Sequence, residues 1–299
     1  MSDPILVLGC HGQVAQELAK VARLEGRRIV LAGRETLDLI SDPDPLRLLD
    51  QHRPCAVINA AAFSAVDQAE KEPAPAFRLN AEVPALYAGA CAERGLPFVS
   101  FSSDYVFDGS KGAPYLEDDP RAAINVYGQT KVASEDGIAA AGDQWTVLRT
   151  SWLFSASGWN FVKTMLRLAA QRDEIGVVDD QVGRPTWAED CARVSLMAVD
   201  ALHAGRRDAV GVFHLSGEGD ATWADLAEAT FAVSRGSGGP SARVRRVTSA
   251  EYPTPAARPH DSRLDAGKLH RVLGWEPRPW RDALIRCMAD MTAADRQAA

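Results

Sequence analysis

The residues best suited to chemistry are Tyr127 and Lys131, which lie four positions apart in the run Tyr127-Gly-Gln-Thr-Lys131. On a helix this spacing places both side chains on one face. There we expect the ammonium to lower the pKa of the phenol and make it a usable proton donor or acceptor. Ser103 lies twenty-four residues upstream, after the apolar, strand-like run 97–101. The pair alone also fits a surface contact on an amphipathic helix, so its interpretation depends on the elements around it.

A glycine-rich segment near the N-terminus lies where a dinucleotide-binding turn is expected, although its spacing is G-x-x-G-x-x-A rather than G-x-G-x-x-G. Gly9-Cys-His-Gly12-Gln-Val-Ala15 follows the apolar run 5–8 and precedes a helical pattern. In that context one glycine makes the tight turn, another lets the backbone approach a pyrophosphate, and the helix N-terminal amides face the anion. Any tight strand-to-helix turn uses glycine, so the position at the first strand is what favours a nucleotide site. We interpret His11 as a loop residue rather than a metal ligand or a base.

The choice of dinucleotide is expected to depend on the end of the second strand. A carboxylate there binds the ribose 2′-hydroxyl of NAD, whereas a guanidinium accommodates a 2′-phosphate. The sequence has Arg34 followed by Glu35. Arg34 favours NADPH, and Glu35 leaves NADH open.

The first two-thirds of the chain alternate between short β-branched runs and longer helical patterns. Strands are predicted at 5–8, 28–31, 55–59, 97–102, 145–149 and 175–178. Helices are predicted at 13–23, 45–52, 74–94, 127–140 and 160–170, followed by a helix at 187–203 and a strand at 210–215 that returns to the same sheet. This alternation predicts an α/β fold, a Rossmann-type doubly wound parallel sheet with helices on both faces.

The pattern changes after Gly217. A helix start at Thr222, with Asp225 three residues on, is followed by a Gly/Ser loop at 235–241 and a basic strand. A proline-rich stretch at 252–259 and a helix at 279–291 close the chain. We therefore expect a smaller, mainly C-terminal α/β substrate domain. The predicted division assigns 1–155 and 187–217 to the dinucleotide-binding domain and 156–186 and 218–299 to the substrate-binding domain.

Composition excludes several classes of protein. The net charge of −7 argues against a nucleic-acid binder, and Arg243-Val-Arg-Arg246 is too short to change that, so we interpret it as a solvated edge strand. The five cysteines are scattered without C-x-x-C spacing, which predicts buried free thiols in a reducing compartment. Neither a signal sequence nor an apolar run long enough for a membrane span is recognisable. We expect a cytoplasmic protein that does not bind membranes.

Taken together, the motifs resemble those of the extended short-chain dehydrogenases/reductases, and among them the dTDP-4-dehydrorhamnose reductase family. The resemblance covers residues 5 to about 284. The matching blocks are Gly12-Gln-Val, Asn59-Ala-Ala-Ala-Phe-Ser-Ala-Val-Asp67, Ser102-Ser-Asp-Tyr-Val-Phe-Asp-Gly109, Asn125-Val-Tyr-Gly128, Arg149-Thr-Ser-Trp152, Asp180-Gln-Val-Gly-Arg-Pro-Thr186, Ala257-Arg-Pro259 and Ser262-Arg-Leu-Asp265. The chain departs from the family pattern at Ala15, Ser103 and Ser134, where Gly, Thr and Gly are usual. Ser103 keeps the hydroxyl, so the chemistry is unaffected.

The resemblance implies reduction of the C4 ketone of a dTDP-4-keto-6-deoxyhexose by NADPH, with Tyr127 as proton donor. Lys131 would lower the phenol pKa and hold the nicotinamide ribose, and Ser103 would hydrogen-bond the ketone oxygen. The implied cofactor-binding residues are Gly9, His11, Gly12, Gln13, Val14, Arg34, Asp38, Leu39, Ala60, Ala61, Ala62, Tyr127 and Lys131. The implied substrate-binding residues are Ser64, Val66, Asp104, Tyr105, Trp152, Gln181, Thr186 and Arg258. Trp152 equally fits a core position.

Some members of this family dimerise around Mg²⁺, and Glu17, Glu189 and Asp190 match positions where its ligands occur. A homodimer and a bound Mg²⁺ are therefore expectations of the resemblance. All three carboxylates equally fit solvated helix positions.

Other functions remain open on the same fold. A 4,6-dehydratase would carry Asp-Glu after its Ser or Thr, whereas this chain has Ser103-Asp104-Tyr105. An epimerase would recycle its dinucleotide rather than consume it. A related deoxysugar 4-ketoreductase of secondary metabolism shares the motifs, as does the non-catalytic regulatory subunit of methionine adenosyltransferase.

Overall fold

The computed structural model describes residues 3–298 and is built on one six-stranded parallel sheet. The strand order is β10-β5-β4-β3-β1-β2, and every neighbouring pair is parallel. The strands are β1 Ile5–Leu8, β2 Ile29–Ala32, β3 Ala56–Asn59, β4 Phe98–Ser103, β5 Trp145–Thr150 and β10 Gly211–Leu215. The Rossmann-type order is confirmed, including the return of the late strand β10 to the sheet beside β5.

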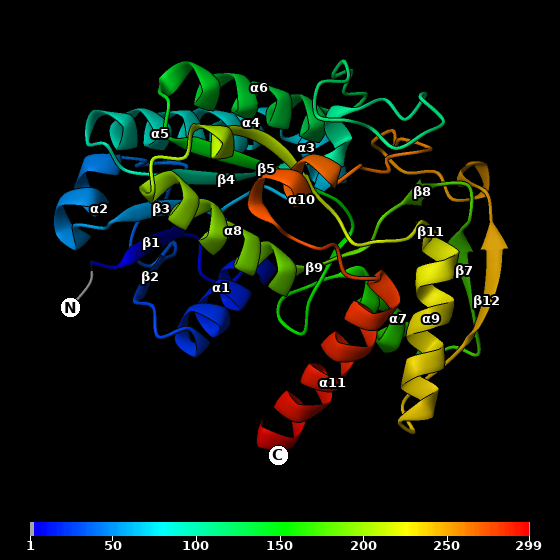
Figure 1. Ribbon diagram of the computed structural model, residues 1–299. Coiled ribbons are helices and arrows are strands. Elements are labelled where there is room, and N and C mark those ends of the chain that lie inside the picture. The colour runs from blue at the N-terminus through cyan, green and yellow to red at the C-terminus, as the bar shows by residue number, and fades with distance from the viewer. Residues whose placement is uncertain (1–2, 299) are drawn as a thin grey trace.

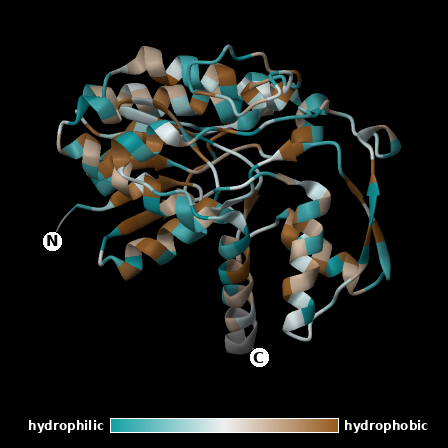
Figure 2. Ribbon diagram, turned by 45° about the vertical axis from the view of Figure 1, so that its right-hand side comes forward, coloured by the Kyte–Doolittle hydropathy of each residue, from teal (hydrophilic) through white to brown (hydrophobic). Residues whose placement is uncertain are grey.

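Helices cover both faces of this sheet (Figure 1). Ile5 and Val7 of β1 share one core with α1 (Gln13–Leu24) and α8 (Ala188–His203). The alternate residues Leu6 and Leu8 share the other core with α5 (Val83–Glu93) and α6 (Val126–Ala141). Because successive strand side chains point to opposite faces, a fully apolar strand is buried on both sides. Figure 2 shows the hydrophobic residues concentrated on these strands and the inward sides of the helices.

The helix predicted over 74–94 is confirmed in its extent, but it is not α-helical throughout. The segment forms α4 (Pro73–Phe77), a π-helical turn over Arg78–Glu82, and α5. Within the turn the buried Asn80 side chain accepts a hydrogen bond from Phe63 N at 2.7 Å and donates one to Thr130 Oγ1 at 3.0 Å. These tertiary bonds, and a proline at the start of α5, favour a local departure from α-helical spacing.

The strand predicted at 175–178 also has a different partner from the one expected of the alternating series. β7 (Glu174–Val178) pairs in parallel with β12 (Arg243–Val247), outside the central sheet. The two strands lie with α7 (Phe161–Ala169) and α9 (Trp223–Gly236) at the right of Figure 1. The basic strand β12 is a largely exposed strand, and Thr222 and Asp225 form the capping box of α9, both as predicted.

The remaining helices and strands complete the fold. They are α2 Pro45–His52, α3 Val66–Lys71, β6 Leu153–Phe154, β8 Val182–Gly183, β9 Thr186–Trp187, β11 Ala221–Thr222, α10 Gly267–Leu273 and α11 Trp280–Ala298, with 3-10 turns at Asp104–Val106, Arg207–Ala209 and Ser249–Glu251. No helix among residues 3–298 is both long and apolar enough to cross a membrane. All five cysteines are free; Cys10 and Cys55 are only partly buried.

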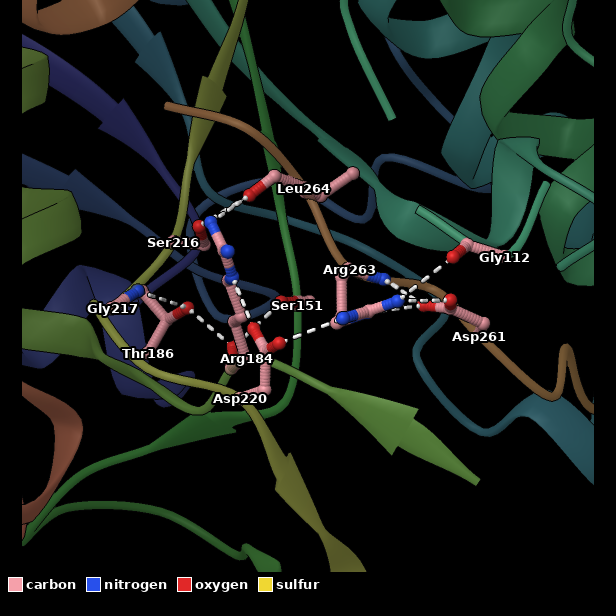
Figure 3. Close-up of polar contacts among 10 residues, drawn as sticks. All are labelled: Gly112, Ser151, Arg184, Thr186, Ser216, Gly217, Asp220, Asp261, Arg263 and Leu264. Carbon is pink, nitrogen blue, oxygen red and sulfur yellow. Dashed lines mark hydrogen bonds and ion pairs between the residues drawn. The ribbon is translucent and has the colours of Figure 1, made fainter. Parts of the chain in front are cut away.

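An ionic network joins segments that are far apart in sequence (Figure 3). Asp220 accepts hydrogen bonds from Arg184 Nε at 2.9 Å and from Arg263 Nη1 at 2.7 Å. Arg263 also donates to Asp261, and Arg184 Nη1 donates to Leu264 O at 2.8 Å. The network therefore joins Arg184, which follows β8, and Asp220, which precedes β11, to the segment 261–264.

Candidate active site

The glycine-rich turn has the geometry that an anion-binding turn needs. Gly9 has a φ of +99°, and a Cβ at this position would lie 3.2 Å from Ala61 N. A side chain there would be strained and would separate β1 from β3. Gly12 caps α1 in an extended conformation, and the first turn of α1 carries no acidic residue. The N–H groups at this helix start can therefore donate hydrogen bonds to a phosphate without repulsion from a nearby carboxylate.

A cavity of about 390 Å³ opens beside this turn, at the carboxyl ends of β1, β2 and β3. Most of the predicted cofactor-binding residues line it. They are Gly9, His11, Gly12, Arg34, Asp38, Leu39, Ala60, Ala61 and Ala62. The sequence did not single out Cys10, Leu37 or Ile40, which line the same cavity. The glycine-rich turn itself could have identified Cys10, and the position of the second strand could have identified Leu37 and Ile40.

A second cavity of about 270 Å³ adjoins the first. Both cavities are lined by Gly12, Ala60, Ala61 and Ala62. The structure brings Ser103, Tyr127 and Lys131 together here, although they come from the end of β4 and from α6. Further predicted residues line this cavity as well. They are Gln13, Val14, Ser64, Asp104 and Trp152.

Tyr127 and Lys131 lie on one face of α6, as their spacing predicts. Lys131 Nζ lies 5.7 Å from the centre of the Tyr127 ring and donates a hydrogen bond to Phe101 O at 3.1 Å. Asn125 caps the helix by accepting from Gly128 N at 2.7 Å. A Cβ at Gly128 would lie 2.1 Å from Tyr105 O, so only glycine lets this first turn approach the end of β4 so closely.

The predicted lowering of the Tyr127 pKa is wrong. Desolvation and the nearby Asp104 carboxylate raise the pKa of Tyr127 to about 12, against a smaller lowering by its hydrogen bond with Ser103. Burial likewise lowers the pKa of Lys131 to about 8, partly opposed by Glu135. The sequence could not show how deeply the phenol is buried, and this burial is the main cause of the raised pKa. A phenol with this pKa keeps its proton at neutral pH, as a proton donor must.

Asp104 is buried directly beside the reacting side chains. It accepts a hydrogen bond from Ser103 Oγ at 2.8 Å. Desolvation raises the pKa of this carboxyl to about 6, against hydrogen bonds from Ser262 and Ser103. Ser103 in turn accepts a hydrogen bond from Tyr105 N at 3.2 Å. The hydroxyl of Ser103 is thus held at the end of β4 by its two following residues.

Trp152 links the second cavity to a third. Its backbone has a φ of +48°, and its ring stacks on Trp223 with centroids 3.6 Å apart and planes 5° apart. A Cβ at Gly183 would lie 2.4 Å from the Trp152 ring, so the glycine makes room for it. A left-handed conformation at a tryptophan is unusual and is maintained by surrounding contacts. Sequence patterns gave no sign that Trp223, seventy-one residues later, would be its partner.

The third cavity has a volume of about 550 Å³ and is bordered by α7, β7 and β12. Tyr105, Gln181 and Arg258 line it, as do the unpredicted residues Asp67, Phe161 and Trp223. Arg258 Nη2 pairs with Asp67 at 3.0 Å, and its guanidinium carbon lies 6.0 Å from the Tyr105 ring centre. Its charge therefore faces the cavity from an ordered position.

Two predicted substrate residues are not brought to these three cavities. Val66 begins α3, and Thr186 is fully buried in β9. The Thr186 hydroxyl donates to Arg184 O at 3.2 Å and accepts from Gly217 N at 3.4 Å, so it contributes to the junction drawn in Figure 3. A contact of either residue with substrate stays a prediction.

The three residues predicted for Mg²⁺ make ion pairs with basic side chains. Lys20 Nζ lies 3.0 Å from Glu189 and 3.5 Å from Glu17, and Arg278 lies 3.3 Å from Asp190. Arg193 also pairs with Glu189 at 3.0 Å, so three basic side chains compensate the charge of the three carboxylates. This arrangement does not favour a metal ion, and no step below depends on one. The pairing with Arg278 was not visible in the sequence because that residue comes some ninety positions later.

The doubly wound sheet and the grouping of Ser103, Tyr127 and Lys131 beside a dinucleotide-type turn define the class of extended short-chain dehydrogenases/reductases. Comparison with known proteins then gives the family. The family model for the RmlD substrate binding domain matches residues 3–293, so the chain belongs to this family. The resemblance inferred from the sequence motifs is confirmed.

Individual relatives agree with this assignment. The chain is 41% identical over 283 residues to a dTDP-4-dehydrorhamnose reductase of Sinorhizobium fredii (strain NBRC 101917 / NGR234), covering 94% of this chain and 95% of the relative. It is 39% identical over 294 residues to a probable dTDP-4,6-dihydroxy-2-methyloxan-3-one 4-ketoreductase of Streptomyces antibioticus, covering 97% and 96%. A crystal structure of a dTDP-4-dehydrorhamnose reductase from Bacillus anthracis str. Ames in complex with NADP is similar, with a TM-score of 0.88, 32% identity and coverage of 97% and 100%.

Proposed function

We propose that the protein reduces the C4 ketone of dTDP-4-dehydro-L-rhamnose to give dTDP-L-rhamnose, with NADPH as the reductant. The observation that carries this proposal is the convergence of Ser103, Tyr127 and Lys131 in a cavity that shares its lining with the dinucleotide cavity. The choice of sugar rests on the relatives, which are named dTDP-4-dehydrorhamnose reductases. The choice of dinucleotide rests on the similar crystal structure in complex with NADP.

The end of the second strand supports NADPH over NADH. Arg34 is exposed, lines the dinucleotide cavity and is available to a 2′-phosphate. The neighbouring Glu35, which could accept a ribose hydroxyl, has its carboxylate 3.0 Å from His11 Nε2. We therefore expect the guanidinium, rather than the carboxylate, to determine the preference.

Each reacting side chain has a defined part in this proposal. When bound, NADPH supplies the hydride that reduces sugar C4. Tyr127 donates its phenolic proton to the oxygen of the former ketone as negative charge develops there. The Ser103 hydroxyl turns from Asp104 to donate to the same oxygen, which orients the ketone and stabilises the developing charge. Lys131 contributes a buried positive charge next to the phenol.

The rest of the substrate is proposed to occupy the third cavity. Arg258 presents a guanidinium suited to a diphosphate, and Trp223, which is stacked on Trp152, offers an aromatic wall. This placement assigns hydride chemistry to the region 1–155 with 187–217, and nucleotide-sugar binding to 156–186 with 218–299.

The test is an absorbance assay of NADPH oxidation with dTDP-4-dehydro-L-rhamnose, followed by NMR analysis of the sugar product. We expect stoichiometric NADPH consumption, formation of dTDP-L-rhamnose, and a lower kcat/KM with NADH. A product isomer formed without net NADPH consumption would indicate an epimerase instead. Absence of turnover with any 4-keto sugar nucleotide, together with copurification of a synthetase, would favour the regulatory-subunit alternative.

A second candidate is the reduction of a different dTDP-4-keto-deoxysugar. The relative from Streptomyces antibioticus, a probable 4-ketoreductase of another sugar, is 39% identical over 97% of this chain. The same assay distinguishes the two functions if both substrates are offered in competition. The substrate with the higher kcat/KM identifies the function, and NMR gives the configuration at C4.

A further inference from the structure

A thiol, an imidazole and a carboxylate lie together at the rim of the dinucleotide cavity. Cys10 and His11 follow β1, and Glu35 follows β2. One ligand atom from each of these residues lies within 4.8 Å of the other two. His11 Nε2 is 3.0 Å from Glu35 Oε1, and Cys10 Sγ is 3.8 Å from Glu35 Oε2. Cys10 and His11 line the dinucleotide cavity, but none of the three side chains takes part in the proposed transfer of hydride or proton.

These separations suit a tetrahedral cation site. Zn²⁺ takes thiolate sulfur at about 2.3 Å, imidazole nitrogen at about 2.0–2.1 Å and carboxylate oxygen at about 2.0–2.2 Å. Tetrahedral angles then require ligand atoms roughly 3.3 to 3.6 Å apart. The measured S···O and N···O separations lie within half an ångström of that range. The two separations end on different oxygens of the Glu35 carboxylate, and the sulfur and nitrogen atoms lie within 4.8 Å of each other, so side-chain rotation brings the three ligand atoms onto one ion.

The backbone around the cluster is built to allow this approach. A Cβ at position 33 would lie 2.1 Å from Cys10 Sγ and 2.7 Å from a Glu35 carboxylate oxygen, so Gly33 provides the space in which the thiol and the carboxylate meet. Gly9 N donates to Ala32 O at 2.7 Å and holds the two strand ends together. His11 and Glu35 are 79% and 71% exposed, which leaves them open to an ion from solvent.

In place of the loop role expected for His11 from the sequence, we propose that Cys10, His11 and Glu35 bind a borderline-soft divalent cation, with Zn²⁺ the best match to the ligand set. A mixed sulfur, nitrogen and oxygen set favours Zn²⁺ over Mg²⁺ or Ca²⁺, which take oxygen ligands. Three protein ligands leave the fourth position open to water or another oxygen donor. This site is separate from the carboxylates around Lys20, and it does not depend on the proposed reductase activity.

The test uses the full chain without dinucleotide and Co²⁺ as a spectroscopic probe. We expect one equivalent of Co²⁺ to give a thiolate-to-cobalt charge-transfer band and visible bands of a tetrahedral ion, and one equivalent of Zn²⁺ to remove both. Cys10→Ser should abolish the charge-transfer band, and Glu35→Gln and His11→Asn should each weaken binding at least about tenfold. The matched control is Cys55→Ser, because Cys55 is the other partly buried thiol. It should leave the spectrum unchanged.

A measurement on the unaltered protein covers the case in which a variant fails to fold. Zn²⁺ should slow alkylation of Cys10 by iodoacetamide, followed by peptide mass spectrometry, and should leave the rate at Cys55 unchanged. A wild-type protein that binds Co²⁺ without a thiolate band, or one in which Zn²⁺ protects neither thiol, would overturn the proposal. Because neither assay uses NADPH or a sugar, failure here leaves the proposed function untouched.

Discussion

At the residue scale, the proposed chemistry depends on Tyr127 keeping its proton until a ketone accepts it. Replacement by Phe removes that proton and leaves the ring that packs edge-on against Tyr105 at 6.0 Å. We expect Tyr127→Phe to lower kcat by about 10² to 10⁴-fold, as loss of a general acid does. Affinity for NADPH, measured by fluorescence titration, should change by less than about twofold, a free-energy change well below 1 kcal/mol.

The matched control for this variant is Tyr87→Phe. The Tyr87 hydroxyl is buried in α5 away from the site and has no hydrogen-bond partner among the described residues. Its removal should leave kcat close to the wild-type value. Near-normal turnover of Tyr127→Phe would contradict the role given to this phenol.

The pH dependence of the reaction should report on Lys131. Burial lowers the pKa of Lys131 to about 8, so its ammonium is charged below that pH and neutral above it. The pKa of Tyr127, at about 12, keeps the phenol protonated throughout this range. We therefore expect kcat/KM to decline as pH rises through about 8, measured from pH 6 to 10. Lys131→Arg should be slower but flat over the range because a guanidinium stays charged. A wild-type profile that rises above pH 8 would exclude this role for the ammonium.

The identities of these residues could be predicted from the sequence, but their electrostatics could not. The Y-x-x-x-K spacing gave the shared helix face, and the position after a strand gave Ser103. The sign of the Tyr127 pKa change was wrong because it depends on desolvation, which results from the packing of β4, α6 and the 3-10 turn at Asp104–Val106. No local pattern in the sequence contains that information.

At the element scale, α6 is tied to the sheet by a buried ion pair one turn after Lys131. Glu135 accepts hydrogen bonds from Arg149 Nε at 2.8 Å and Nη2 at 2.7 Å, and from Ser102 Oγ at 2.5 Å. Both charged side chains are 3% exposed. The pair therefore links α6 to β5 and β4 and fixes the helix that presents Tyr127.

We expect Glu135→Ala to destabilise the protein by about 3 to 5 kcal/mol, because Arg149 would be left buried without its counter-charge. Urea unfolding followed by circular dichroism gives the change in free energy. The neighbouring Asp136→Ala is the control: Asp136 is 62% exposed and pairs with Arg121 at 2.7 Å. Its loss should cost less than about 1 kcal/mol. Equal effects of the two variants would show that the buried pair does not hold α6.

The positions of the helices and strands could be predicted from periodicity, but the π-helical turn at Arg78–Glu82 could not. Apolar spacing over 74–94 is continuous enough to predict one helix. The π-helical turn arises from Asn80, whose side chain is satisfied only by Phe63 and Thr130 from other elements. A hydrogen bond between distant segments leaves no periodic trace in the sequence.

At the scale of the whole molecule, NADPH and the nucleotide sugar are proposed to bind in different regions, one around the glycine-rich turn and one around the third cavity. The ionic network of Figure 3 joins segments of these two regions. Hydrogen–deuterium exchange should therefore separate them. NADPH should slow exchange at 9–16 and 59–63, around the glycine-rich turn. Addition of dTDP should slow exchange at 161–181 and 245–258, around the third cavity. Protection of the same segments by both ligands would contradict the division of labour between the two regions.

The sheet could be predicted because its strands alternate with helices in sequence. The C-terminal region was predicted only in outline, since β7 pairs with β12 across sixty-eight intervening positions and Trp152 stacks on Trp223. These contacts depend on how two parts of the chain meet. No local spacing in the sequence indicates either the pairing of β7 with β12 or the stacking of the two tryptophans.

The most direct measurement follows the hydride itself. The protein is incubated with dTDP-4-dehydro-L-rhamnose and NADPH in which both hydrogens at nicotinamide C4 are replaced by deuterium, and the sugar product is examined by NMR. Deuterium at C4 of dTDP-L-rhamnose is the result we predict. Oxidation of NADPH without deuterium at sugar C4, or a product labelled at another carbon, would contradict direct reduction of the ketone in this site.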